Sequence, residues 1–394
     1  MTDENAELWV RRGPALQRST LIELFFDLVF VFALSQVSDK LARSLTPIGF
    51  LQVLLLLLAV WWVWSVTTWA TDLYTQRAGL NLLIIVVMFG VLLMASSLPG
   101  AFGPRGLAFA ASYVLAHLVR TSTLLYAVRK HPIRRRPIRV LFWILMSSPL
   151  WIAGAFLPAT PRIALWAAAL VIDYTAANIG WPVPRLGRSS ISEWNLVAEH
   201  LAERYQQIVI IALGETILTI GGAYAVGGSS PDATLAMATS FLITALLWQL
   251  YSVGAGLRIS RAFAAGSHAG RYARRLDWSH LLMVEGIVLT GVGYDLVIGR
   301  PTGQTPWAWA AVIIGGPALF LVGRIHLGLV VLGMVPRSVP LGIVALAALV
   351  PAAIVIPPLA VAFATMLILL AVLLPHLRVI EHDAAELMRR EASG

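Results

Sequence analysis

Apolar runs of about 17–25 residues follow one another along nearly the whole 394-residue chain. A run of this length, folded as an α-helix, crosses the roughly 30 Å hydrocarbon core of a membrane. About a dozen such runs are found, and only 12% of the residues are charged, whereas soluble domains carry about a quarter. The sequence therefore predicts an all-α fold, namely a polytopic integral membrane protein with about 12 transmembrane helices.

The runs define twelve expected membrane-spanning helices, the last two of which are separated only by Pro357 and Pro358. Their expected bounds are residues 20–41, 48–70, 79–98, 106–128, 138–157, 162–181, 200–223, 233–256, 278–298, 306–328, 339–356 and 357–375.

The positions of Lys and Arg predict the orientation of the chain. With both termini on one side, 23 of these residues fall in the terminal segments and loops on that side and 5 on the other. Short cytoplasmic loops carry an excess of Lys and Arg, so both termini are expected to be cytoplasmic. No removable signal peptide is expected at the N-terminus. The net charge of +9 then indicates orientation and contact with membrane lipids, and no nucleic acid partner is expected.

Two expected helices carry polar side chains at four-residue or eight-residue intervals. The first contains Glu23 and Asp27, followed at the same spacing by Ser35 and Asp39, and the seventh contains Glu203, Gln207 and Glu215. Such spacing keeps side chains near one face of a helix. Because an ionisable group costs about 2.5–3.5 kcal/mol to insert and usually faces a bundle interior or an aqueous cavity, these residues are expected to line a substrate or ion pathway.

A second pair of segments suggests an internal duplication. Trp61-Trp-Val-Trp64-Ser65-Val66 resembles Trp248-Gln-Leu-Tyr251-Ser252-Val253. Helices one and two would thus correspond to helices seven and eight in two parallel six-helix repeats. The expected organisation is a cytoplasmic N-terminal segment (1–19), a first repeat (20–182), a cytoplasmic linker (183–199), a second repeat (200–375) and a cytoplasmic tail (376–394).

Further candidates for the pathway are ionisable residues inside other expected helices. His117 and Arg120 lie three residues apart, and an arginine at this depth needs an acidic partner or water. The sequence leaves both its partner and its role open, as a structural salt bridge or a gate. Candidate acidic partners are Asp27, Asp173, Glu215 and Glu285, and His280 is expected in the same polar core.

Four tryptophans crowd the second expected helix: Trp61, Trp62, Trp64 and Trp69. They are interpreted as helix packing and interfacial anchors, or as an aromatic lining that binds an organic cation. The chain has no cysteine and no metal-binding signature, so no cofactor and no metal site are expected. Whether it forms a homo-oligomer is left open.

The segment Glu23-Leu-Phe-Phe-Asp27-Leu-Val-Phe resembles the opening signature of the bacterial low temperature requirement protein A (LtrA) family. The tryptophan-rich second helix, His200-Leu-Ala-Glu203-Arg204, Leu213-Gly214-Glu215-Thr216 and His280 extend the similarity over residues 20–290. The resemblance implies a protein of the bacterial cytoplasmic (inner) membrane. The family is named for a growth phenotype rather than for a reaction.

A weaker resemblance links Phe25-Phe26-Asp27 to the Phe-Ser-Asp signature of a family of endolysosomal and bacterial potassium channels. That family also has two six-helix repeats. Here Phe26 replaces the serine, and the second-half triplet Tyr205-Gln206-Gln207 lacks the acid.

Three functions are compatible with these patterns. The leading hypothesis is a transporter or channel-like protein whose buried carboxylates pass protons, cations or a small solute. In it Asp27 attracts the cation or substrate, Glu215 couples protonation to passage, and Arg120 pairs alternately with them. The alternatives are a membrane enzyme acting on an isoprenoid or lipid, and a sensor or scaffold whose polar residues lock helices together.

Overall fold

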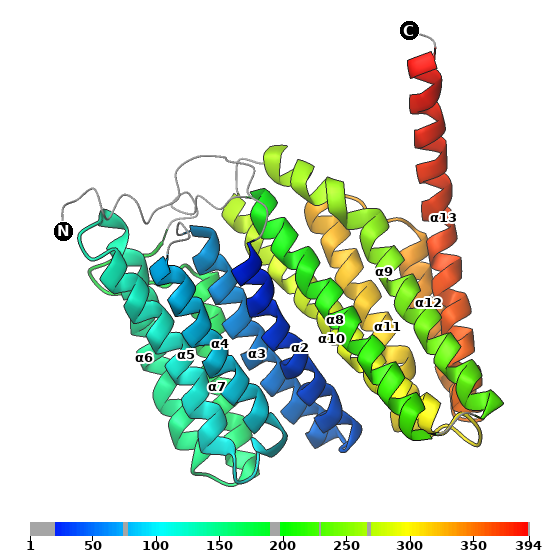
Figure 1. Ribbon diagram of the computed structural model, residues 1–394, viewed down its shortest axis with the longest axis horizontal. Coiled ribbons are helices and arrows are strands. Elements are labelled where there is room, and N and C mark those ends of the chain that lie inside the picture. Colours follow the sequence, from blue (N-terminus) through cyan, green and yellow to red (C-terminus); the bar gives the residue numbers. More distant parts are fainter. Residues whose placement is uncertain (1–19, 74–77, 190–197, 228–229, 266–268, 393–394) are drawn as a thin grey trace. The chain divides into compact units, whose positions relative to one another are not determined.

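The computed structural model describes residues 20–73, 78–189, 198–227, 230–265 and 269–392. Twelve α-helices and no β-strand lie in these ranges, which confirms the all-α class (Figure 1). The helices are α2 (Leu21–Ala42), α3 (Pro47–Leu73), α4 (Ala78–Ser97), α5 (Gly106–Ala127), α6 (Arg135–Ala155), α7 (Ala159–Asn178), α8 (Ala198–Gly227), α9 (Pro231–Ala265), α10 (Ala269–Gly299), α11 (Trp307–Leu327), α12 (Ser338–Ala353) and α13 (Pro358–Ala392).

Each expected membrane-spanning segment coincides with one of these helices. Ten of the helices in the described ranges are long and apolar enough to cross a membrane. Of the other two, α12 has only 16 residues, and α7 carries both Arg162 and Asp173. The twelve-span count therefore remains a prediction. The last helix continues past the expected membrane boundary at residue 375 to Ala392, whereas the predicted N-terminal segment and linker residues 190–197 lie outside the described part.

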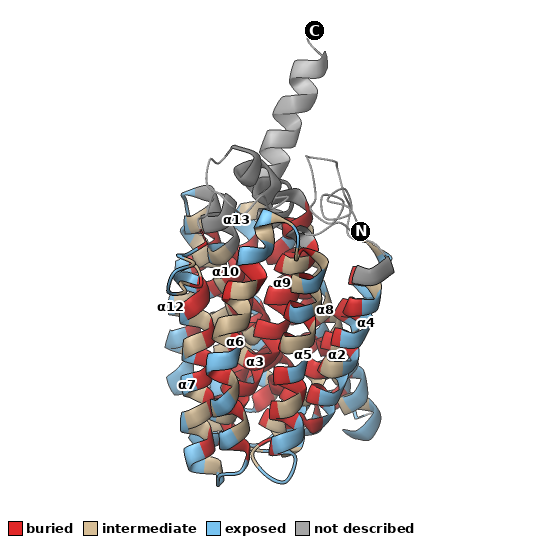
Figure 2. Cartoon of the chain, turned by 90° about the vertical axis from the view of Figure 1, so that its left-hand side faces the viewer, coloured by how far each residue is buried: buried red, intermediate tan, exposed pale blue. Residues whose placement is uncertain are grey.

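Helix α2 buries two acidic side chains and exposes some of its large apolar ones. Glu23 and Asp27 are buried, while Phe25 and Leu28 are exposed. Figure 2 shows such buried and exposed positions alternating along the helices. Since large apolar side chains are stable toward lipid and ionisable ones are not, this pattern is the one expected of a membrane-spanning helix.

The chain divides into two compact units, Met1–Ile211 with Phe263–Asp277 and Ala212–Ala262 with Trp278–Gly394. In the first unit, α4 packs on α2 and α5, α5 on α6, and α6 on α7, while α3 contacts α2, α4, α5 and α7. The first part of α8 belongs to this unit and carries polar side chains that bond to α2. The division into two six-helix repeats is a separate matter and remains a prediction.

The second unit contains a close helix contact built on glycine. A Cβ atom at Gly286 of α10 would lie 2.5 Å from the backbone nitrogen of Phe320 in α11 and 2.7 Å from the Gly316 carbonyl oxygen. Small residues allow membrane helices to approach until their backbones touch. Elsewhere in this unit α11, α12 and α13 pack on one another.

Candidate functional site

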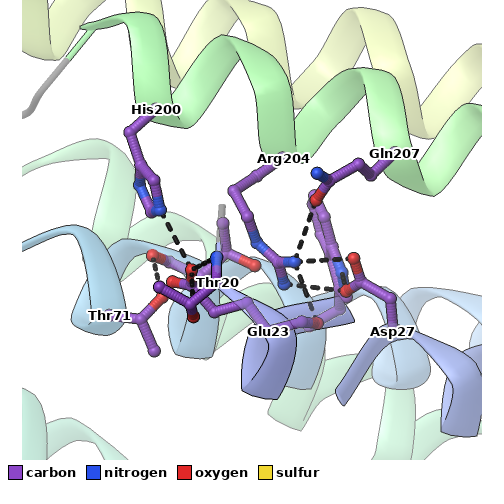
Figure 3. A network of polar contacts seen from close by, with 9 residues as sticks. Thr20, Glu23, Asp27, Thr71, His200, Arg204 and Gln207 are labelled. Carbon is purple, nitrogen blue, oxygen red and sulfur yellow. Dashed lines mark hydrogen bonds and ion pairs between the residues drawn. The ribbon is translucent and has the colours of Figure 1, made fainter. Parts of the chain in front are cut away.

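The most deeply buried charges of the first unit are an ion pair between α2 and α8. The Arg204 guanidinium forms a bidentate ion pair with the Asp27 carboxylate. Its hydrogen bonds run from Nη1 to Oδ2 at 2.6 Å and from Nη2 to Oδ1 at 2.7 Å (Figure 3). Both residues are 0% exposed. The Trp64 indole donates to Asp27 Oδ1 at 3.0 Å. Two-pronged pairs of this kind are among the strongest hydrogen bonds in proteins.

A second acid–base pair lies one helical turn away. His200 Nε2 is 3.1 Å from Glu23 Oε2, an ion pair when the imidazole is protonated. The same carboxylate oxygen accepts hydrogen bonds from the backbone N–H and the hydroxyl of Thr20, at 3.0 and 2.9 Å. Glu23 thus closes the first turn of α2 and holds α8 at once. Glutamate in the first turn is also favoured by the helix dipole.

The two pairs follow directly from helix geometry. Glu23 and Asp27 are four residues apart, as are His200 and Arg204, so each pair shares a helix face. The acidic face of α2 meets the basic face of α8, and Arg204 also donates to the Glu23 carbonyl and to the side-chain oxygen of Gln207, at 3.0 and 3.2 Å. The region is consequently a cluster of paired charges inside one unit.

A third carboxyl, Asp277, lies in a separate cluster with hydroxyl partners. Its Oδ1 accepts hydrogen bonds from Ser65 at 2.7 Å and from Tyr205 at 2.8 Å. The Trp69 indole in turn donates to the Tyr205 hydroxyl, at 3.3 Å. Asp277 is buried, and an ionised carboxyl is costly at such a site without a paired charge. The hydrogen-bond partners of this carboxyl are thus neutral hydroxyl groups.

Arg120 lies in a third cluster and is almost completely buried. It donates to Thr67 Oγ1 at 3.3 Å and to His117 Nδ1 at 2.8 Å. Because a guanidinium can only donate, His117 accepts through Nδ1 and carries its proton on Nε2. Asp173, also buried, accepts from the Tyr113 hydroxyl at 2.8 Å, and its charge also acts on Arg120. Asp27, another candidate partner for Arg120, forms its pair with Arg204.

Two of these clusters reach one small cavity of about 60 Å³ in the first unit. Trp69 and Arg120 both form part of its wall. A water needs about 10–15 Å³ by this measure, so the volume of the cavity corresponds to about four to six waters. Its other lining residues include Thr121, Arg136, Trp181 and Ser189. The cavity thus connects the Asp277–Tyr205–Trp69 chain with the Arg120 cluster.

The tryptophans of α3 are buried and pack against other rings. Trp61 and Trp64 have ring centroids 4.9 Å apart, and Trp62 lies 4.5 Å from Tyr174. Trp69 makes an edge contact with Trp62 at 6.2 Å. Of the four, Trp69 lines the cavity. Helix packing thus accounts for the positions of most of the group, and Trp64 and Trp69 also donate hydrogen bonds.

The second unit holds the other predicted site residues. Glu215 is buried and accepts a hydrogen bond from Thr219 at 3.0 Å. His280 is buried against the Tyr251 hydroxyl at 3.0 Å, and Glu285 is half-buried. Glu203, on the part of α8 in the first unit, is half-buried as well. Within the described ranges no group of three or more acidic or histidine side chains could hold a metal ion.

The structure places further buried polar residues in these clusters that the sequence analysis did not select. His200 and Arg204 were quoted only as part of a family motif, and Asp277 was not considered. The four-residue spacing of His200 and Arg204, equal to that of Glu23 and Asp27, was the available signal. Asp277 directly precedes the expected membrane-spanning segment 278–298. Its neighbours in the sequence therefore do not distinguish it from an acidic residue at the membrane surface.

A bundle of apolar helices that exposes aliphatic side chains and buries paired charges defines a polytopic membrane protein. Residues 18–374 match the family model described as bacterial low temperature requirement A protein (LtrA). The chain belongs to this family, as its opening motif indicated. An uncharacterized protein of Rhizobium meliloti (strain 1021) is 35% identical over 395 residues, which cover 99% of this chain and 95% of that protein. No solved structure matches the chain.

Proposed function

We propose that this protein carries a small solute or cation across the bacterial cytoplasmic membrane, with buried carboxyl groups of the helices taking up and releasing protons. Both termini would lie on the cytoplasmic side, as the Lys and Arg distribution predicts. The observation that supports the proposal is the cavity of the first unit, because Trp69 in its wall is linked through Tyr205 to Asp277, a buried carboxyl bonded to hydroxyl groups.

The hydrogen bond between Tyr205 and Asp277 suits proton transfer. A hydroxyl both donates and accepts, so Tyr205 can hand a proton to Asp277 while it accepts the hydrogen bond from Trp69. The Trp69 indole can only donate, so it would orient the Tyr205 hydroxyl, and the proton that replaces the one given to Asp277 would come from cavity water that reaches this hydroxyl directly. Asp27 and Arg204 take a different part in the proposal: their mutual neutralisation allows two charges to lie in the membrane, and protonation of Asp27 would weaken the contact between α2 and α8.

The test is proton flux in liposomes that contain the purified protein and a pH-sensitive dye. Asp277→Asn and Asp27→Asn should abolish flux, and Glu215→Gln tests the role that the sequence assigns to the second unit. Asp39→Asn is the matched control, since Asp39 is an exposed carboxyl on α2. Only variants that elute as folded protein are compared. Flux equal to wild type in both Asp27→Asn and Asp277→Asn would reject the proposal.

A sensor or scaffold is the second candidate function, and the α2–α8 pairs favour it. Both Asp27 oxygens and Glu23 Oε2 are occupied by donors of the unit itself. In this second function the closed pairs would fix the two helices together. This function predicts no flux for the wild-type protein under any imposed gradient, together with a loss of thermal stability when either pair is neutralised.

A further inference from the structure

The loop that follows α7 holds a tryptophan in an unusual backbone conformation. Trp181 has a φ angle of 47°, and Gly180 before it has a φ angle of 84°. Left-handed φ values cost little at a glycine but are rare for a bulky residue. Trp181 is nevertheless buried, and its backbone N–H donates to the Ala176 carbonyl at 2.7 Å. Residues held in such conformations cluster at clamps and switch regions of proteins, so the surroundings of Trp181 point to a role beyond packing.

Side chains of α6 clamp this loop in place. The Arg139 guanidinium donates from Nη2 to the Leu186 carbonyl at 2.6 Å and from Nη1 to Ser189 Oγ at 3.1 Å. The Trp143 indole donates to the Pro182 carbonyl at 3.0 Å. Hydrogen bonds from a charged group are stronger than those between neutral groups. The loop is therefore fixed to α6 on both sides of its turn.

The clamped loop forms one wall of the small cavity in the first unit. Trp181 and Ser189 line this cavity together with residues of α3, α5 and α6. The Trp181 ring meets the Trp69 ring edge-on, with the ring centroids 6.4 Å apart. Most of the lining residues are apolar, namely Val66, Trp69, Ala70, Leu124, Pro137, Val140 and Trp181. Water leaves narrow apolar passages readily, so a single bulky ring at such a wall can decide whether the cavity is hydrated.

We propose that Trp181 is a hydrophobic gate, which controls whether water enters the small cavity and reaches the hydrogen bonds that end at Asp277. The ring narrows the entry while the Arg139 bonds hold the loop against α6, and release of these bonds widens it. The gate would thereby act on Trp69, which lines the same cavity and donates to the Tyr205 hydroxyl. Its use in proton transfer rests on the proposed function, whereas its control of water entry does not.

The experiment uses the absence of native cysteine. Thr121→Cys places one thiol in the buried wall of the cavity, and its rate of reaction with a small, charged methanethiosulfonate is measured on the full chain in nanodiscs. Adding Trp181→Gly removes the ring, and because glycine adopts left-handed φ values without strain, the loop should keep its backbone. The reaction should become at least about tenfold faster, as expected when a hydrophobic constriction is opened. Adding Arg139→Gln instead should also accelerate it, because the loop loses its clamp.

Two matched controls separate gating from general loosening. Adding Arg188→Gln, at an exposed position of the same loop, should leave the rate of Thr121→Cys within about twofold. A thiol at the exposed position of Lys130→Cys should react equally fast with and without Trp181→Gly. An unchanged rate of Thr121→Cys after removal of the ring overturns the gate, and so does equal acceleration by Arg188→Gln. If proton flux is absent while Trp181→Gly still accelerates the reaction, the proposed function fails and the gate is supported.

Discussion

Neutralising Asp27 tests the α2–α8 ion pair most directly. In Asp27→Asn the Arg204 guanidinium keeps its burial and loses its anion, and the new amide N–H₂ group faces a cation that can only donate. Breaking a buried pair in this way costs about 3–5 kcal/mol of unfolding free energy. Arg204 retains the Glu23 carbonyl and Gln207 as acceptors, so the lower end, about 3 kcal/mol, is expected.

The loss should be visible in thermal unfolding in detergent, followed by tryptophan fluorescence at a fixed scan rate. At about 2–4 °C per kcal/mol for a unit of roughly this size, Asp27→Asn should unfold about 6–12 °C below wild type. Asp39→Asn, on the exposed side of the same helix, should stay within about 2 °C.

The double variant Asp27→Asn with Arg204→Gln separates pairing from simple burial. It removes both charges, so it should recover at least half of the stability lost in Asp27→Asn, because no isolated cation is left in the apolar interior. The reasoning is refuted if Asp27→Asn is as stable as Asp39→Asn. It is refuted equally if the losses of the two single variants simply add in the double variant.

Three further outcomes are expected. Gly316→Ala should lower the unfolding temperature by several degrees, because its Cβ would lie 2.5 Å from the Thr290 hydroxyl oxygen. Gly315→Ala, with open space at that position, should be neutral or slightly stabilising. Equal effects of the two variants in the same thermal assay would argue against the close contact. Arg162→Lys should destabilise the protein by about 2–4 kcal/mol in denaturant titration, since one ammonium cannot replace a guanidinium that donates to five backbone carbonyls. An unfolding midpoint equal to that of the wild-type protein would contradict this. Tyr205→Phe should keep the fold yet reduce proton flux in liposomes at least tenfold, because it removes the hydroxyl between Trp69 and Asp277; unchanged flux would exclude Tyr205 from the proton path.

Hydropathy was sufficient to predict where the helices lie, because the length of each apolar run can be counted in the sequence and compared with the thickness of a membrane. It could not settle the number of crossings, since α12 is short and α7 carries charges. The apolar surroundings of Asp27 in the sequence indicated a buried carboxyl, and the structure shows that Trp64 donates to it. The partner of opposite charge was not predictable in the same way. Arg120 and Arg204 are both arginines within apolar runs, and only the packing of α8 on α2 distinguishes them.

The predicted four-residue spacing of polar side chains was informative over short distances and misleading over longer ones. Glu23 and Asp27 do share a buried face, but Asp39, twelve residues further along α2, is exposed. A residue every four positions drifts by about 40° per step at 3.6 residues per turn, so the face has rotated away by the end of the helix. Asp277 was missed for the opposite reason, because its partners Ser65 and Tyr205 come from distant parts of the sequence.

The matched spacing of the acids on α2 and the bases on α8 has a mechanical consequence. A slide of α2 by four residues, about 6 Å at 1.5 Å per residue, would place Glu23 opposite Arg204 and re-form one contact, while any smaller offset would leave all four charges mismatched. The ion pairs therefore favour discrete registers of these two helices over a continuous slide of one along the other.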